Sequence, residues 1–324
     1  KAINTAGLEV VAPASTVKWD QTKPAATVVL PANNAYAKTL PSVTGAASDP
    51  GAGASGVAGT QIQIKLDDNI CWSGAAWSAN CLTETSWLTA VAGTPWTKAT
   101  QLPLADNTPG GLEDGRQYDI SARAFDAAAN TQTATTANIY RFDVSSPTAA
   151  NVLPLHTARY NALPTLSGTA QDNAPGAFNV TFPQVRIHDI LLNQYWVDGT
   201  GWVTSAFPGF PDLWNVALDS TPTGGVFTWR YDASLVTWPD RDNGLRVETK
   251  ALDVAGNYQQ ASSTFSFDAT RPTSQVTYPP VDGVSYSSMT ALYGNSSDIS
   301  SPINDVRVKM WYLSGASTYY WSPA

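Results

Sequence analysis

An aromatic residue followed by aspartate, with a proline four residues after the aspartate, occurs three times in the 324 residues of the chain. The copies are Trp19-Asp20…Pro24, Phe142-Asp143…Pro147 and Phe267-Asp268…Pro272, and their aspartates are 123 and 125 residues apart. Each copy is followed by a glycine and, four residues later, an aspartate: Gly45 and Asp49, Gly168 and Asp172, Gly294 and Asp298. Three copies in the same order indicate a tandem repeat of about 124 residues, which is long enough to enclose its own core.

The end of the repeat has its own pattern. It reads Tyr118-x-Ile120-x-Ala122-x-Ala124-x-Asp126 in one copy and Leu245-x-Val247-x-Thr249-x-Ala251-x-Asp253 in the next, with Asn130 and Asn257 four residues further on. The first residues, Ala2-Ile3-Asn4-Thr5-Ala6-Gly7, match 251–256. We therefore predict that 1–20 is the tail of a preceding repeat, 21–145 and 146–269 are whole repeats, and 270–324 is the first half of a further, truncated repeat.

The hydrophobic pattern within each repeat is that of strands. Apolar and polar residues alternate at 62–64, 185–187 and 306–308 and in the two closing runs, as in half-buried strands. Clusters of Gly, Pro, Asn and Asp separate these short runs, and no stretch combines a helical period with caps. The pattern predicts an all-β fold with one antiparallel β-sandwich per repeat. Because proline stiffens the connectors and no Gly/Ser tract is present, we expect an extended rod.

The closing run from Gly115 to Asp126, the sequence Asp253-Val254-Ala255-Gly256-Asn257 and the Phe-Asp-x-x-x-Pro junctions resemble tandem bacterial immunoglobulin-like (Ig-like or fibronectin-III-like) repeats. Such repeats belong to large extracellular surface or appendage proteins. The resemblance covers essentially the whole chain and implies tandem Ig-like sandwiches. Ala129 departs from the pattern, because the other copy has Gly256 there, so we expect the two closing turns to differ.

The chain has two cysteines, Cys71 and Cys81, on either side of a segment with tryptophan and glycine. A zinc site would need further ligands, and the two histidines, His156 and His188, fall in another repeat. We predict a local disulfide, hence an oxidising, extracellular location, with a pair of free thiols as the alternative. No apolar run approaches the length of a transmembrane helix.

The balance of charged residues indicates which partners the chain can bind. There are 18 Lys and Arg against 26 Asp and Glu, a net charge of −8, and no basic cluster. A nucleic-acid partner is therefore not expected. We expect partners to be other copies of the chain, or proteins and glycans of a cell surface.

Tryptophans flank Gly-containing turns in two successive repeats: Trp72, Trp77, Trp196 and Trp202. Stacked aromatic rings on a β-sandwich can bind sugar rings, so these four residues are candidate glycan ligands. The alternative is that they are cross-strand pairs that stabilise two hairpins. Because the motif recurs with the repeat, we favour the structural interpretation.

Oxygen ligands for calcium are also present. Asp126, Asn130 and Asp143 occur near the end of a repeat and are weak candidates for a Ca²⁺ site. The alternative is that they are turn residues, because no dense Asp-x-Asp-x-Asp loop is present. No other cofactor is expected.

Catalysis is not expected. No nucleophile motif surrounds His156 or His188, and the recurring carboxylates occur once per repeat, as turn and cap residues do. The sequence predicts a non-catalytic structural or adhesive segment of a large multi-repeat bacterial extracellular protein, on a cell surface or in a filament. The alternative is a carbohydrate-binding accessory segment of a secreted glycan-active enzyme.

Overall fold

A computed structural model describes residues 1–66, 70–78, 80–133, 135–172, 183–210, 212–217, 219–223, 226–280 and 283–322. Within these residues the chain is nearly all β, and its helical content is one 3₁₀ turn, Glu84–Ser86. The chain divides into two compact units. The first comprises Lys1–Pro147, Asp172–Thr181 and Leu252–Tyr258, and the second comprises Thr148–Gln171, Phe182–Ala251 and Gln259–Ala324.

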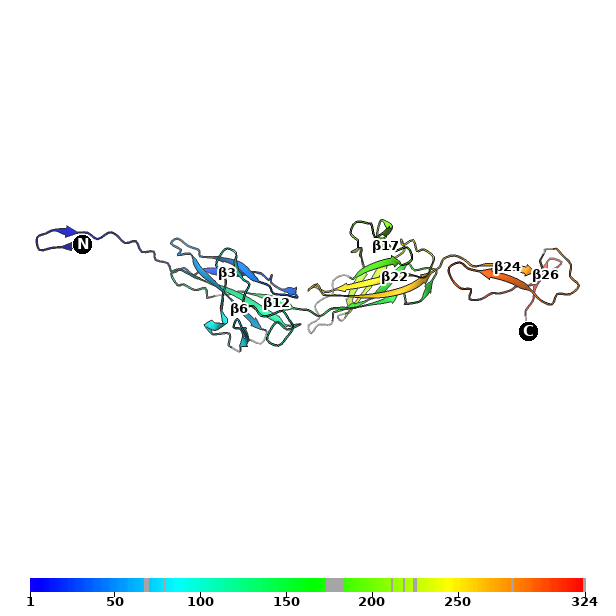
Figure 1. Ribbon diagram of the computed structural model, residues 1–324, viewed down its shortest axis with the longest axis horizontal. Coiled ribbons are helices and arrows are strands. Elements are labelled where there is room, and N and C mark those ends of the chain that lie inside the picture. Colours follow the sequence, from blue (N-terminus) through cyan, green and yellow to red (C-terminus); the bar gives the residue numbers. More distant parts are fainter. Residues whose placement is uncertain are drawn as a thin grey trace. The chain divides into compact units, whose positions relative to one another are not determined.

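The first sandwich has two sheets (Figure 1). The smaller sheet has the order β10-β5-β3, with bounds Trp96–Lys98, Val43–Ser48 and Ala25–Leu30. The larger has the order β4-β12-β11-β6-β7-β8, with bounds Ala35–Ala37, Ala137–Phe142, Gln117–Asp126, Val57–Leu66, Cys71–Trp72 and Trp77–Ser78; β9 (Leu88–Thr89) also pairs with β6. All these pairs are antiparallel except β4 with β12.

The same arrangement occurs a second time. One sheet has the order β13-β15-β21-β20, with bounds Thr148–Leu153, Thr165–Gln171, Val226–Asp232 and Asp219–Thr223. The other has the order β14-β23-β22-β16-β17-β18, with bounds Arg159–Tyr160, Tyr258–Phe267, Arg241–Leu252, Gln184–Asp189, Gln194–Val197 and Gly201–Thr204; β19 (Asn215–Val216) also pairs with β16. Again one pair, β14 with β23, is parallel. This is the strand order of an Ig-like sandwich, which confirms the predicted fold class.

The closing run of the first repeat forms a strand, as predicted, and this strand, β11, lies between β12 and β6 in the larger sheet. Every second residue of β11 from Tyr118 to Asp126 is buried, and this face packs on the core. The Tyr118 hydroxyl accepts a hydrogen bond from the Glu113 N–H at 2.8 Å, the tyrosine corner of Ig-like folds. One predicted strand is wrong: 306–308 is not a strand, because no neighbouring strand in the described part of the chain pairs with it.

Two of the three recurring glycines face a tryptophan. Gly45 on β5 is paired with Trp96 on β10, and Gly168 on β15 with Trp229 on β21. Both indoles are fully buried. A Cβ at Gly45 would lie 2.3 Å from an indole carbon, and one at Gly168 would lie 2.4 Å from the equivalent carbon. An added Cβ would lie still closer to a carbonyl oxygen of the neighbouring strand, 1.9 Å from that of Thr27 and 2.1 Å from that of Ala150. At the third glycine, Gly294, the closest atom is likewise a carbonyl oxygen, that of Gln275 at 2.6 Å, so close approach of the neighbouring backbone is what the three positions share.

The closing turns were expected to differ, and this expectation was wrong. Ala129 and Gly256 both have positive φ, 70° and 85°. In both turns the aspartate N–H donates to the carbonyl of the asparagine four residues later, at 3.1 Å from Asp126 and 3.0 Å from Asp253. The hydrogen bonds of the turn therefore impose the left-handed conformation even on alanine.

The remaining strands form two-stranded sheets. The pairs are β1 (Ala2–Ile3) with β2 (Glu9–Val10), β24 (Thr273–Tyr278) with β25 (Tyr293–Ser297), and β26 (Trp311–Ser314) with β27 (Ser317–Tyr320). The prolines that recur eleven residues after the connector aspartates, Pro31, Pro154 and Pro279, each follow a cis peptide bond.

In the described part of the chain, no helix is long and apolar enough to span a membrane.

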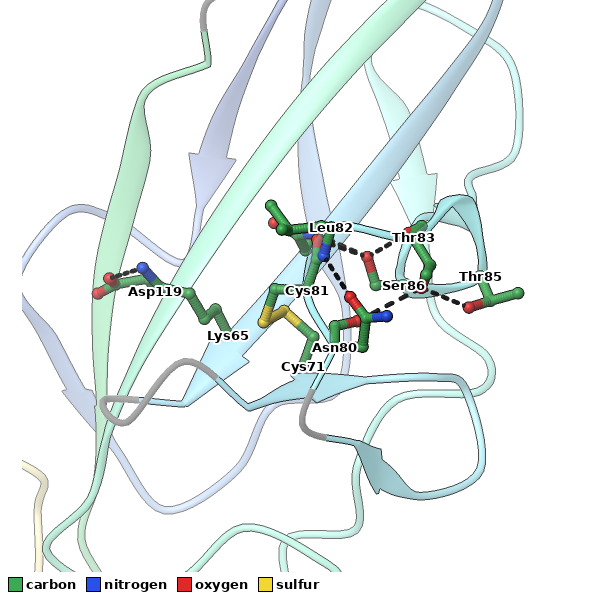
Figure 2. Close-up of a disulfide and its surroundings, with 10 residues drawn as sticks. Lys65, Cys71, Asn80, Cys81, Leu82, Thr83, Thr85, Ser86 and Asp119 are labelled. Atoms are coloured by element: carbon green, nitrogen blue, oxygen red, sulfur yellow. Dashed lines mark hydrogen bonds and ion pairs between the residues drawn. A yellow bond between two sulfur atoms is a disulfide. The ribbon is translucent and has the colours of Figure 1, made fainter.

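The predicted disulfide is present (Figure 2). Cys71, at the start of β7, is bonded to Cys81, and their Cα atoms are 5.1 Å apart. The carbonyl of Cys81 accepts a hydrogen bond from the Ser86 hydroxyl at 3.2 Å, and the same hydroxyl donates to the Thr83 carbonyl at 2.8 Å. The disulfide therefore fastens the loop after the hairpin to β7.

Candidate functional site

The recurring aspartates come together in two clusters. One is formed by Asp20, Asp49 and Asp126, and the other by Asp143, Asp172 and Asp253. In each cluster the three residues offer one carboxylate oxygen each, all within 4.8 Å of one another. The members occupy equivalent positions: the connector before a repeat, the fourth residue after the recurring glycine, and the end of the closing strand. We call them the Asp20 cluster and the Asp143 cluster.

Hydrogen bonds use most of the oxygens of the Asp20 cluster. Asp20 accepts from the N–H groups of Thr22 at 2.9 Å and Ser55 at 2.7 Å, one on each carboxylate oxygen. Asp126 accepts from the backbone and side-chain N–H groups of Asn130, each at 2.8 Å, again one on each oxygen. Oδ2 of Asp49 accepts from the Gly56 N–H at 2.8 Å, whereas its Oδ1 is buried without a hydrogen bond from the described residues.

The Asp143 cluster is more deeply buried. Asp143 is 0% exposed, Asp253 is 1% exposed and Asp172 is 3% exposed. Oδ1 of Asp143 accepts from the Ser145 N–H at 3.1 Å, and Oδ1 of Asp253 accepts from the Asn257 N–H at 2.7 Å. No hydrogen bond from the part of the chain that the structure describes reaches Oδ2 of Asp143 or Oδ2 of Asp253.

The two clusters also differ in electrostatics. Burial, followed by the neighbouring charges of Asp253, Asp172 and Asp114, raises the pKa of Asp143 to about 7. The hydrogen bonds from Ser55 and Thr22 lower the pKa of Asp20. Burial therefore disfavours the negative charge of Asp143, whereas backbone hydrogen bonds stabilise the negative charge of Asp20.

The calcium candidates predicted from the sequence are divided between the clusters. Asp126 and Asn130 lie together, bonded to each other, whereas Asp143 lies in the other cluster with Asp172 and Asp253. Sequence reasoning had noted the recurrence of all three aspartate positions without expecting them to meet. The calcium prediction itself remains untested.

The connector after each sandwich is held by a carboxylate that the sequence analysis did not single out. Asp114 accepts from the Val144 N–H at 2.8 Å and from the Ser145 hydroxyl. In the second copy Asp240 accepts from the Ala269 N–H at 2.9 Å and from the Thr270 hydroxyl. Asp114 precedes Asp143 by 29 residues and Asp240 precedes Asp268 by 28, so this spacing was a signal that could have been found.

The four candidate glycan-binding tryptophans form two cross-strand pairs. Trp72 on β7 is paired with Trp77 on β8, and their rings are 5.2 Å apart with an interplanar angle of 62°. Trp196 on β17 is paired with Trp202 on β18, with rings 5.8 Å apart at 72°. The predicted hairpins are thus confirmed. The pairs meet edge to face, and neither forms the coplanar platform on which a sugar ring stacks.

The indole N–H groups of these residues bind within the chain. The acceptors are the carbonyls of Gln101 for Trp72, Gly111 for Trp77 and Thr237 for Trp202, and the carboxylate of Asp198 for Trp196. Trp72 and Trp196 are also buried. These contacts match the structural interpretation of the hairpins; whether any of the four binds a glycan remains a prediction.

The two histidines lie apart. His188 stacks on Tyr195, with ring centroids 4.3 Å apart and an interplanar angle of 4°, and its Nε2 is 3.2 Å from Oδ1 of Asn193. His156 accepts a hydrogen bond from the Thr264 N–H at Nδ1. Burial lowers the pKa of His188. Both rings have structural contacts, and the structure places neither in one of the two aspartate clusters.

No family model and no curated protein matches the chain. Among solved structures it is similar to the fibronectin(III)-like modules of Clostridium thermocellum CbhA, with 10% identity and a TM-score of 0.34, over 75% of this chain and 94% of that one. It is also similar to the titin domains Z1Z2 in complex with telethonin, with 11% identity and a TM-score of 0.22, and to DIP-gamma IG1+IG2, with 12% identity and a TM-score of 0.28. Both matches cover 76% of this chain and 97% of the other. These scores are too low to support an argument; the strand order places the chain among Ig-like and fibronectin-III-like β-sandwich proteins.

Proposed function

We propose that the chain is a non-catalytic structural segment of a larger extracellular protein, in which Ig-like repeats act as a spacer on a bacterial cell surface or in a filament. An adhesive role would belong to the array as a whole rather than to one repeat. The presence of a disulfide is compatible with an oxidising, extracellular location.

One observation carries this proposal: the recurring polar residues hold the connectors between repeats. The side chain of Asn130 donates to the carbonyl of Asp20 at 3.1 Å, and that of Asn257 donates to the carbonyl of Asp143 at 3.1 Å. Because Asn257 is 5% exposed, its bond is protected from water. Residues that recur once per repeat and bind the connector serve the geometry of an array.

The connector after Asp143 is held by two separate parts of the chain. Asn257 binds the Asp143 carbonyl, while Asp114 binds the next two residues, Val144 and Ser145. Pro147 then removes one backbone donor and fixes φ. A connector with so few free torsions suits a spacer that must keep its length.

Small-angle X-ray scattering of the chain tests this proposal. We expect an elongated particle with a narrow distribution of maximum dimensions. The double variant Asn257→Ala/Asp114→Ala should broaden that distribution, whereas Asn193→Ala, in a loop of the second sandwich, should not. A compact particle, or a distribution that the double variant leaves unchanged, would contradict the spacer function.

A glycan array separates this proposal from the carbohydrate-binding alternative. A spacer should bind no glycan on the array. Binding that is lost in Trp202→Ala, with folding intact by circular dichroism, would replace the spacer by a carbohydrate-binding function.

A further inference from the structure

We infer that Asp143, Asp172 and Asp253 bind a divalent cation of the oxygen-seeking class, calcium being the best match, and that the equivalent Asp20 cluster does not. This inference goes beyond the spacer function and does not depend on it. The two clusters share their positions in the repeat, so the difference must come from the hydrogen bonds around them.

The Asp143 cluster has oxygens without donors. Asp143 and Asp253 are buried, and Oδ2 of each accepts no hydrogen bond from the described residues. A carboxylate oxygen from each member lies within 4.8 Å of the others. Carboxylate oxygens on opposite sides of an ion lie at about this separation, because Ca²⁺–oxygen distances are roughly 2.3–2.6 Å.

The negative charge of the Asp143 cluster also favours a bound cation. Three carboxylates buried together repel one another and have lost their hydration, so the cluster needs either a proton or a cation. A further carboxylate, that of Asp114, is bound to the connector and adds negative charge. A hard dication neutralises such a site, and calcium tolerates irregular sets of carboxylate and carbonyl ligands better than magnesium does.

The contacts of one asparagine explain why the other cluster differs. The side-chain N–H of Asn130 donates to Oδ2 of Asp126 at 2.8 Å. Both asparagines also donate to the carbonyl of the connector aspartate, Asp20 or Asp143, at 3.1 Å. The second side-chain contact of Asn257, however, is to Oδ1 of Asp143 at 3.4 Å and not to Asp253. Oδ2 of Asp253 is thereby left for another partner.

The remaining members of the Asp20 cluster are also less suited to an ion. Both oxygens of Asp20 accept backbone N–H groups, and Asp20 is half-buried. One oxygen, Oδ1 of Asp49, remains without a donor in the described part of the chain. A single such oxygen does not supply the several ligands that calcium requires.

Isothermal titration calorimetry of the chain with calcium chloride, after treatment with a chelator, tests the inference. We expect one calcium ion per chain. Asp253→Asn should weaken binding by roughly tenfold to a hundredfold, since removal even of supporting groups costs metal sites that much. The matched variant Asp126→Asn, in the Asp20 cluster, should leave both affinity and stoichiometry unchanged.

A second readout guards against misfolding of Asp253→Asn. Calcium should raise the melting temperature of the wild type and of Asp126→Asn, but not that of Asp143→Asn. The inference is overturned if calcium does not bind, if two ions bind and Asp126→Asn removes one, or if Asp253→Asn and Asp143→Asn bind calcium like the wild type. Scattering by the chelated chain reports on the spacer function separately, so the two proposals can fail independently.

Discussion

Gly168 lies directly across the sheet from Trp229, and the indole occupies the space that a side chain at position 168 would need. A Cβ there would also lie 2.1 Å from the carbonyl oxygen of Ala150 on the other neighbouring strand. The glycine is therefore enclosed by an indole on one side and by backbone on the other.

We expect Gly168→Ala to lower the free energy of unfolding by about 3 kcal/mol, because overpacking a core forces backbone and side chains to move. Gly199→Ala is the control: its φ is +72° but no atom lies within 4 Å of the added Cβ, so about 1 kcal/mol is expected. Urea denaturation measures both. Equal costs would show that the indole is not the constraint.

The equivalent residues of the two closing turns, Ala129 and Gly256, can be exchanged for each other to test the strain in each turn. Ala129 has a φ of 70°, a region that costs an L-residue roughly 1 kcal/mol, and Gly256 has a φ of 85°. We expect Ala129→Gly to raise the free energy of unfolding by up to about 1 kcal/mol and Gly256→Ala to lower it by a similar amount. Thermal denaturation checks the signs. If Ala129→Gly destabilises the chain, the turn is not strained.

Reduction of the disulfide should destabilise the first sandwich without unfolding it. Cys71 and Cys81 close a loop with a sequence separation of 10. Chain entropy assigns roughly 3 kcal/mol to so short a loop. The double variant Cys71→Ala/Cys81→Ala should lower the urea concentration at which the first sandwich is half unfolded. Dithiothreitol should lower it by the same amount in the wild type. If dithiothreitol leaves the midpoint of the wild type unchanged while the double variant is shifted, loss of the cross-link is not the cause.

His188 should make the second sandwich less stable in mild acid. Burial holds its pKa below the ordinary value of 6.5, so the unfolded chain binds the proton more readily than the folded chain. The folded state is therefore not penalised by His188 above pH 6.5. It loses free energy of unfolding as the pH falls from 6.5 towards the lower pKa of the folded state. His188→Phe keeps a ring on Tyr195 and should remove this dependence between pH 7 and 5. An NMR titration that gives His188 a pKa above 6.5 would refute the sign.

Much of the fold could be predicted because its signals are local. Alternation predicts strands such as β11 from a few consecutive residues, and the spacing of Trp196 and Trp202 predicts their hairpin. Strand 306–308 was predicted wrongly because alternation does not reveal whether a partner strand is present. The resemblance to Ig-like repeats supplied the tandem sandwich architecture, which no single segment contains.

The contacts that build the candidate site are long-range and were not predictable in the same way. Asp143 and Asp253 are 110 residues apart, and only the pairing of strands brings them together. Trp229 follows Gly168 by 61 residues, whereas Trp96 follows Gly45 by only 51, because the intervening loops differ in length. Fixed spacing therefore revealed the glycines and aspartates but missed the tryptophans.

The contacts at the connectors also bear on how such a chain could arise. Asn130 holds the connector that enters its repeat and Asp114 holds the one that leaves, and Asn257 and Asp240 do the same in the next repeat. Each repeat thus encodes the anchors for both of its own ends. Duplication or recombination of the DNA for one such unit would insert a module with its attachments already formed, so an array could lengthen without new mutations at its joints.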